Sequence, residues 1–263
     1  MDGRMDAPGV REDDGPWIPI EPSPRRVRVE FGGETVVDSQ GVMLLREAKR
    51  VPIYFFPKED VRMDWLEESG PGARHPKLGD ATWWTLKVGG RTAENAVWSY
   101  LNPSDEGADI RGHLAFEWNA MDAWTEEEEE VFVHARDPYK RVDVLKSARH
   151  VRVMVGGEVV AETRRPSLLL ETGFPVRYYI PMEDVRMEFL ELTPTSTRCP
   201  YKGTARYWSV RAGGAVRADI VWSYPDPIAE CPKIKDLLCF FDEHVDAIYV
   251  DGERAPKPVT PWS

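Results

Sequence analysis

The chain carries the same local pattern, Pro-x-Glu-Asp-Val-Arg-Met, at two positions that lie 124 residues apart. The two copies contain Asp60 and Asp184, and the same offset pairs many other residues without a gap. Further pairs are Gly32-Gly33 with Gly156-Gly157, Leu44-Leu45 with Leu168-Leu169, Gly89-Gly90 with Gly213-Gly214, Trp98-Ser99-Tyr100 with Trp222-Ser223-Tyr224, and Phe116 with Phe240. A period this long indicates two tandem domains, because each copy is large enough to bury a core of its own.

The composition is that of an ordinary globular protein, and it narrows the possible partners. Hydrophobic residues make up 42% of the 263 residues and charged residues 30%. A net charge of −11 disfavours a nucleic-acid partner, because phosphate binding needs clustered Lys and Arg. No apolar run approaches the roughly 20 residues of a membrane helix, and the first residues lack the apolar core of a signal peptide. We therefore expect a cytoplasmic protein with no membrane partner, whose cysteines, Cys199, Cys231 and Cys239, are reduced.

Short stretches of alternating apolar and polar residues predict an all-β fold for each copy. In each copy two such stretches flank a Gly-Gly turn, as in a β-hairpin. We expect strands at 27–31, 35–37, 44–45, 51–56, 61–65, 82–88, 97–100 and 131–133, and at 151–155, 159–160, 168–170, 176–180, 185–189, 206–211 and 221–224. The segments 110–118 and 232–241 fit a short helix or a strand equally well, so the fold contains at most short helices.

The repeat and the composition divide the chain into five segments. We expect a flexible, proline-rich leader (1–24), a first β module (25–135), an ordered connector (136–148), a second β module (149–254) and a peripheral tail (255–263). The run of glutamates from Glu126 to Glu130 is expected to be a solvated surface segment, because like charges at this density repel each other. The alternative is a site for a cation or a basic partner.

Three motifs of the second copy carry a resemblance to a known family. They are Tyr179-Ile180-Pro181 followed by Asp184-Val185, Thr197-Arg198-Cys199-Pro200-Tyr201-Lys202-Gly203, and Trp222-Ser223-Tyr224 followed by Pro227. With Arg136-Asp137-Pro138-Tyr139 before them, the chain resembles a tandem member of the family called domain of unknown function 427. The first copy departs from the middle motif, because His75 stands where the second copy has Cys199.

The resemblance implies that each module is a β-tent, in which two antiparallel sheets lean together at one end. In several related tents four cysteines bind zinc at the apex, but this chain lacks the Cys-x-x-Cys pairs of such a site, so we expect no metal. A label attached to the family suggests nucleotidyl transfer. That chemistry usually needs two or three carboxylates that gather magnesium, and the Asp60-x-x-x-Asp64 spacing supports it only weakly.

The turn around Cys199 holds the residues best suited to chemistry. Arg198 and Lys202 flank the thiol and would stabilise its thiolate, which favours a nucleophilic cysteine. The same turn, which includes Tyr201, would also suit an anion bound by Arg198, Lys202 and backbone N–H groups. Because the first copy has His75 here, the simplest alternative is that Cys199 is only a small buried residue in a turn.

Charged and aromatic residues on the predicted strands complete the candidate site. Asp184 is the third catalytic candidate, and with Arg186 it could clamp a ligand on a sheet face. The aromatic residues could line an apolar pocket with polar tips. The candidate ligand-binding residues are Tyr179, Arg186, Arg198, Tyr201, Trp222 and Tyr224. For Asp184 and Arg186, the alternative is a structural ion pair that is present in both copies because the module is duplicated. For the aromatic residues, the alternative is packing in the core.

These patterns favour a pocket in the second module that binds or transforms a small polar or anionic metabolite without a metal or nucleotide cofactor. The first module, with its altered motif, would mainly stabilise the fold. A protein-interaction or ligand-sensing module without chemistry is the alternative, and nucleotidyl transfer is a weaker one. The pocket hypothesis predicts that Cys199 and Lys202 face a cavity together with Trp222 and Tyr224, and the oligomeric state is left open.

Overall fold

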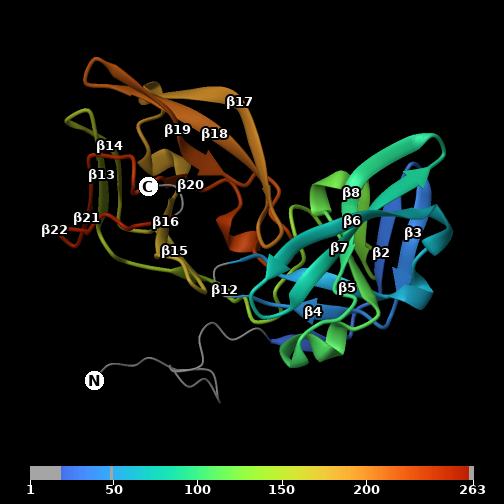
Figure 1. Ribbon diagram of the computed structural model, residues 1–263. Helices are drawn as coiled ribbons and strands as arrows, with labels where there is room; N and C mark the ends of the chain where they lie inside the picture. Colours follow the sequence, from blue (N-terminus) through green and yellow to red (C-terminus); the bar gives the residue numbers. More distant parts are fainter. Residues whose placement is uncertain (1–18, 48–49, 261–263) are drawn as a thin grey trace. The chain divides into compact units, whose positions relative to one another are not determined.

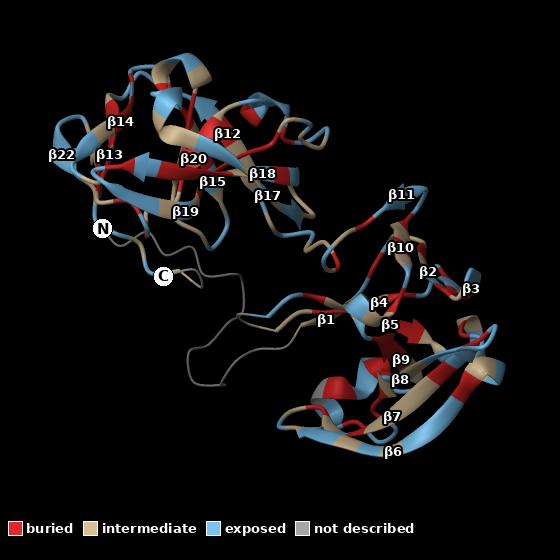
Figure 2. Ribbon diagram, turned by 90° about the horizontal axis from the view of Figure 1, so that it is seen from above, coloured by how far each residue is buried: buried red, intermediate tan, exposed pale blue. Residues whose placement is uncertain are grey.

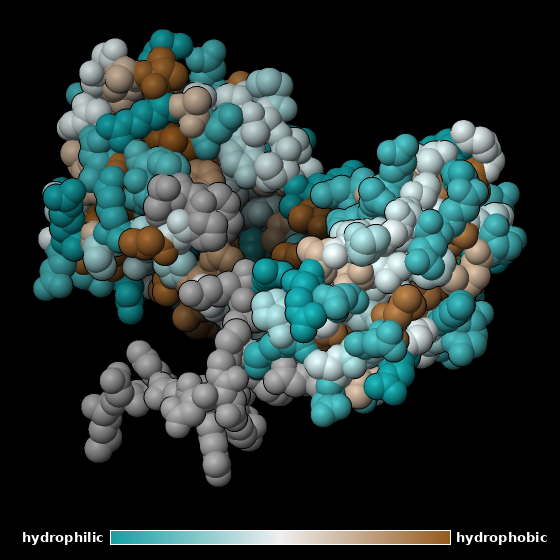
Figure 3. Space-filling view, in the orientation of Figure 1, coloured by the Kyte–Doolittle hydropathy of each residue, from teal (hydrophilic) through white to brown (hydrophobic). Residues whose placement is uncertain are grey.

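The computed structural model describes residues 19–47 and 50–260 of the chain. It contains two compact units, Met1–Asp137 and Pro138–Ser263, each with its own sheets and cores (Figure 1). Polar residues cover most of the visible face of each unit, with apolar residues scattered among them (Figure 3). Among the described residues, no helix is long and apolar enough to cross a membrane.

The first unit contains a seven-stranded and a four-stranded antiparallel sheet. In spatial order the seven strands are β1 (Ile20–Pro22), β4 (Met43–Leu45), β5 (Ile53–Pro57), β9 (His113–Phe116), β8 (Arg91–Ser99), β7 (Gly79–Val88) and β6 (Leu66–His75). The four strands are β11 (Glu129–Glu130), β10 (Ala123–Glu126), β2 (Val27–Phe31) and β3 (Glu34–Ser39). Short 3₁₀ turns lie between strands: η2 (Lys58–Asp60), η3 (Met63–Trp65), η4 (Asp105–Ile110) and η5 (Trp118–Ala120).

The second unit repeats this arrangement strand for strand. Its seven-stranded sheet has the order β12 (Val142–Lys146), β15 (Ser167–Glu171), β16 (Arg177–Ile180), β20 (Leu238–Phe240), β19 (Ala215–Ser223), β18 (Gly203–Ala212) and β17 (Leu190–Cys199). Its four-stranded sheet has the order β14 (Glu158–Thr163), β13 (Val151–Val155), β21 (Ala247–Val250) and β22 (Glu253–Arg254). The 3₁₀ turns are η6 (Met182–Asp184), η7 (Met187–Phe189) and η8 (Pro232–Ile234). The predicted all-β fold of two tandem modules is confirmed.

The central strands of each seven-stranded sheet are buried on both faces. Because successive residues of a strand point to opposite faces, neighbouring residues join different cores. In the second unit Ile180 and Val221 pack toward the four-stranded sheet, whereas Tyr179 and Trp222 pack into a separate cluster on the other face. The first unit divides in the same way, and its strands β5 and β9 are largely buried (Figure 2). This second face is the one that carries the candidate site.

The predicted strands at 61–65 and 185–189 are wrong. After a single bridge to the four-stranded sheet, the chain turns through η3 in the first unit and η7 in the second. In the first unit Arg62 Nε donates to Asp64 Oδ1 at 3.0 Å, and the Arg62 guanidinium lies 3.8 Å from the centre of the Trp65 ring. These local contacts close the turn, so the alternation of apolar residues here does not reflect an extended strand.

Two other segments differ from the expectation, and the structure decides between helix and strand for two more. Residues 20–22, which the sequence placed in the leader, form the edge strand β1, where a proline is tolerated because an edge N–H needs no partner. Residues 131–133 do not form a strand, because the chain turns at Val133 with a φ of 75°. In the segments 110–118 and 232–241 a 3₁₀ turn is followed by a strand, β9 or β20.

The edge strands β6 and β17 are irregular. Each forms a long hairpin with its neighbour, and the pairing register shifts once or twice along it. The shifts fall around Pro71 in β6 and around Pro194 in β17. Proline has no N–H to donate, so neither β6 nor β17 has a continuous row of hydrogen-bonding groups along its outer edge.

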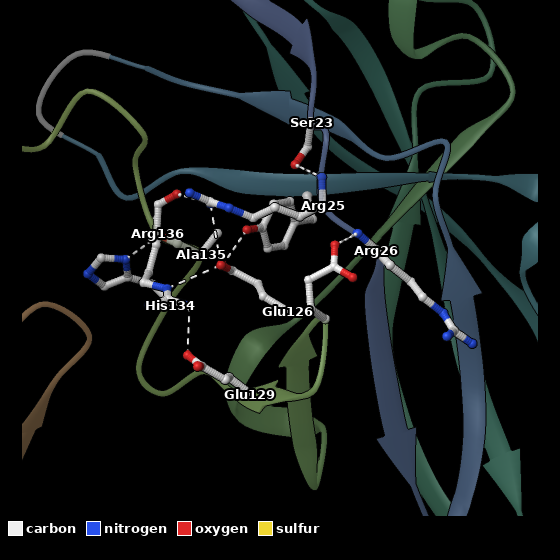
Figure 4. A network of polar contacts seen from close by, with 10 residues as sticks. Ser23, Arg25, Arg26, Glu126, Glu129, His134, Ala135 and Arg136 are labelled. Atoms are coloured by element: carbon white, nitrogen blue, oxygen red, sulfur yellow. Dashed lines mark hydrogen bonds and ion pairs between the residues drawn. The ribbon is translucent and has the colours of Figure 1, made fainter. Parts of the chain in front are cut away.

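Glu126 is buried, unlike the rest of the glutamate run. Its side chain is 2% exposed, and Tyr54 donates its hydroxyl hydrogen to Oε1 at 2.6 Å. Arg136 Nε donates to Oε2 at 3.1 Å, and Arg25 lies 3.4 Å from the same oxygen (Figure 4). Glu126 points inward because side chains alternate between the two faces of β10. The expectation of a solvated segment is therefore wrong for Glu126. It holds for Glu127–Glu130, which are exposed.

Candidate functional site

The aromatic candidates of the second module pack against one another in the core. Tyr179, Trp222 and Tyr224 are only 1%, 8% and 5% exposed. Trp222 Nε1 donates to the Tyr179 hydroxyl oxygen at 3.0 Å, and the two rings meet edge to face. They share this cluster with Ile234 and Cys239. Burial raises the pKa of both tyrosines well above the usual value, so they are neutral hydrogen-bonding groups at pH 7.

Cys199 and Lys202 lie beside this cluster, together with Glu171 at the end of β15. Lys202 Nζ donates to Glu171 Oε2 at 2.6 Å, and the two side chains are 12% and 11% exposed. Lys140 Nζ lies 3.2 Å from the other oxygen of the same carboxylate. Burial opposes the charge on Lys202, but Cys199 and Glu171 outweigh it and raise the pKa of Lys202. A half-buried thiol thus lies next to a nearly buried ammonium group.

Tyr201 and Arg198 flank this pair on different sides. The Tyr201 ring is half-buried, and its centre lies 5.9 Å from Lys140 Nζ. Arg198 precedes Cys199 on β17, so its side chain leaves the strand on the opposite face, and it is exposed. The turn therefore brings Cys199, Lys202 and Tyr201 to one place and directs Arg198 away from it.

Asp184 and Arg186 lie on the side of the four-stranded sheet and do not join Cys199. Asp184 Oδ2 accepts a hydrogen bond from Thr163 Oγ1 at 2.6 Å, and Arg165 donates to both carboxylate oxygens at 3.0 Å. Arg186 pairs with the exposed Glu188 at 2.8 Å. Asp184 and Arg165 border an open surface depression of about 470 Å³.

The first module makes the equivalent contacts around its own aspartate and arginine. Ser39 Oγ donates to Asp60 Oδ2 at 2.6 Å, as Thr163 does to Asp184 in the second module. Arg62 pairs with Asp64 in the first module, in the position that Arg186 has in the second. Contacts that recur in both copies support a structural role, which is the alternative that the sequence left open.

A cavity of about 560 Å³ lies in the first module, on the face of the sheet that corresponds to the predicted site. Its wall includes His75, Trp98 and Tyr100, which occupy the positions of Cys199, Trp222 and Tyr224 in the second copy. Phe55 and Trp83 extend the aromatic wall, with ring centres 6.2 Å and 5.6 Å from that of Trp98. The volume is within the range of about 300–1,000 Å³ that small-molecule sites occupy.

In the second module, the side chains at the positions of the cavity wall contact one another. Phe241 packs on Trp222 with ring centres 4.5 Å apart, and the corresponding residue of the first module is the exposed Glu117. Arg177 donates to Glu243 Oε1 at 2.6 Å, and Ile53 stands at the position of Arg177. The tail that the sequence analysis expected to be peripheral adds a contact, because Thr260 Oγ1 also donates to Glu243 Oε1 at 2.6 Å. Ile53 and Glu117 both border the cavity of the first module, and the second module has the ion pair and the large ring at these two positions.

A family model described as domain of unknown function 427 (DUF427) matches the chain twice, at residues 19–127 and 143–251. The chain belongs to the DUF427 family. The two matches confirm both the resemblance and the tandem repeat. A comparison with curated proteins finds no match.

His75 and Glu47 form the polar end of the cavity in the first DUF427 module. His75 Nδ1 accepts hydrogen bonds from the backbone N–H groups of Lys77 and Leu78, at 3.2 Å and 3.1 Å. A neutral imidazole then carries its proton on Nε2, which lies 3.5 Å from Glu47 Oε1. His75 is thus held as a hydrogen-bond donor toward the cavity, next to a carboxylate acceptor. With Nδ1 occupied, it is poorly placed to act as a base.

Sequence reasoning ranked the two DUF427 modules by how well each keeps the family motif. It favoured the second module because the motif around Cys199 is intact there, and it considered the first module to be degenerate. The cavity is bordered by Ile53 and Glu117, which lie outside the motif and whose counterparts, Arg177 and Phe241, are large. Comparison of side-chain size at the 124-residue offset would have identified them.

Proposed function

We propose that the first DUF427 module binds a small planar molecule in the cavity beside His75 and Glu47. The observation that carries the proposal is a cavity of about 560 Å³ with aromatic walls, whose polar end holds the donor His75 beside the carboxylate of Glu47, which also pairs with Arg50. Sites for small molecules combine an apolar wall with a few polar groups that fix orientation in this way. Trp83, Trp98 and Phe55 supply faces on which a flat ring packs.

The polar end favours a ligand whose ring edge presents an acceptor and a donor side by side. His75 Nε2–H would donate to the ligand acceptor, and Glu47 would accept from the ligand donor. The distance of 3.5 Å between His75 Nε2 and Glu47 Oε1 is long for a hydrogen bond. Arg50 Nε pairs with the other carboxylate oxygen, Oε2, at 3.2 Å. His75 Nε2–H and Glu47 Oε1 therefore retain the capacity to bind a ligand. Leu78 stands where the second module has Lys202, so this site lacks that ammonium group. We therefore propose a neutral polar heterocycle as the ligand class.

Calorimetric titration of the full chain with free purine and pyrimidine bases, pterins and nicotinamide tests the proposal. We expect one ligand to bind per chain, and Glu47→Gln to weaken its binding at least tenfold, because the amide cannot replace a charged acceptor. The matched control is Glu171→Gln, the same change at the equivalent position of the second module, and it should leave binding unchanged. Absence of binding by any compound, or equal loss in both variants, would overturn the proposal.

A further inference from the structure

Two ammonium groups share one carboxylate in the second module. Lys202 and Lys140 approach the two oxygens of Glu171 at 2.6 Å and 3.2 Å, and all three side chains are at most 16% exposed. Lys140 Nζ also donates to the Thr172 carbonyl oxygen at 3.0 Å and lies 4.0 Å from the centre of the Phe174 ring. The three charged groups therefore carry one positive charge in excess. A charge with so little contact with water favours an anion beside it.

Cys199 supplies a thiol beside this excess charge. It is a free, half-buried thiol, and its side chain interacts with Lys202. Cys231 and Cys239 provide a contrast, because they are only 1% and 0% exposed. Burial raises the pKa of Cys231 to about 11 and that of Cys239 well above its usual value. One of the three thiols is thus accessible beside excess positive charge, and the other two are sequestered.

We propose that Cys199 is a nucleophilic thiol that exchanges with small anionic disulfides at a site separate from the cavity of the first module. In the step, the Cys199 thiolate attacks one sulfur of the disulfide, a new S–S bond to Sγ forms, and the old S–S bond breaks. The electron pair of the broken bond leaves on the departing thiolate, which takes up a proton from water if its pKa requires it. The products are a mixed disulfide on the protein and one small thiol.

The positive charge around Lys202 contributes in two ways. It attracts an anionic reagent to the turn, and it stabilises the negative charge that is spread over three sulfurs during exchange. The first module has His75 and Leu78 in place of Cys199 and Lys202, so it offers neither the thiol nor this ammonium group. The activity is specific to the second copy.

The probe is 5,5′-dithiobis(2-nitrobenzoate), an anionic aromatic disulfide that releases one coloured thiolate for each cysteine that reacts. We expect the native full chain to release one equivalent rapidly and the chain in urea to release three, since it has three cysteines. Cys199→Ser should abolish the rapid equivalent. Lys202→Met should slow it about tenfold, whereas Lys87→Met, the same charge change on the surface of the first module, should not.

A neutral disulfide, 4,4′-dithiodipyridine, separates attraction by charge from simple accessibility. For the unaltered chain, added salt should slow the anionic probe and leave the neutral probe nearly unchanged, because salt screens the excess charge. This comparison needs no variant and remains decisive if Lys202→Met fails to fold. Equal salt dependence for the two probes, or rapid reaction of more than one thiol in the native chain, would overturn the proposal. Ligand binding by the first module is measured separately and should be unaffected by Cys199→Ser.

Discussion

Removal of the Tyr54 hydroxyl group tests whether the buried carboxylate of Glu126 holds the first module together. The hydroxyl donates to Oε1 of Glu126 at 2.6 Å, and Tyr54 itself is only 3% exposed. Burial, and next the nearby carboxylate, raise the pKa of Tyr54, so the phenol keeps its proton and remains the donor. A hydrogen bond to a charged group contributes about 1.5–3 kcal/mol. Arg136 and Arg25 still bind Oε2 after the substitution, so we expect Tyr54→Phe to lower the free energy of unfolding by about 2 kcal/mol.

For a unit of this size, that loss lowers the melting temperature by roughly 8 °C, because each kcal/mol corresponds to about 4 °C. Tryptophan fluorescence during urea or thermal unfolding is a suitable assay, since seven of the ten tryptophans precede residue 137. The matched control is Tyr178→Phe, because Val250 stands at the position of Glu126 in the second module. We expect that control to cost less than about 1 kcal/mol. A loss for Tyr54→Phe that is below about 0.5 kcal/mol, or no larger than that of the control, would refute the reasoning.

Four further substitutions, at Gly213, Gly89, Glu117 and Glu243, give distinct outcomes. Gly213→Ala places a Cβ atom 2.0 Å from the Gly156 carbonyl oxygen, whereas Gly89→Ala, at nearly the same φ, meets its nearest atom at 3.8 Å. Chemical unfolding should show about 1–2 kcal/mol of destabilisation for Gly89→Ala and clearly more for Gly213→Ala. Glu117→Phe should fill the cavity of the first module and abolish heterocycle binding in the calorimeter without loss of stability. Burial opposes the charge of Glu243, but its hydrogen bonds lower the pKa to about 2, so its stabilisation is present above about pH 4.5 and is lost toward pH 2; Glu243→Gln should flatten stability over that range.

The periodicity of the sequence determined the strands well, because alternation and Gly-Gly turns are local signals. The duplication, the paired hairpins and the strand option for β9 and β20 all followed from it. The turns η3 and η7 were missed, because Met63 and Trp65 also alternate with charged residues although local contacts of Arg62 close a 3₁₀ turn there. The burial of Glu126 was missed for a related reason, since a run of glutamates gives no sign that one member meets Tyr54 and Arg136 across the module.

The grouping of side chains around Cys199 could be predicted in part. Cys199 and Lys202 do lie together, and Tyr179, Trp222 and Tyr224 share the core cluster beside them. Glu171, which binds Lys202, was not among the candidates, because it lies 31 residues away in the sequence, at the end of strand β15, and no motif links the two positions. Contacts between residues that are distant in the sequence decide which side chains meet on one face of a sheet and where voids remain between them. A sequence motif contains no information about such contacts.

The irregular outer strands have a consequence for how the protein behaves at high concentration. A regular edge strand exposes unpaired N–H and C=O groups, on which a strand from another molecule can add and begin aggregation. Pro71 and Pro194 each remove a donor in the middle of such an edge, and the register shifts bend the remaining groups out of line. The 124-residue offset does not pair Pro71 with Pro194, so the two copies interrupt their edge strands with prolines at different positions. Addition of a strand from another molecule is therefore disfavoured at these two edges.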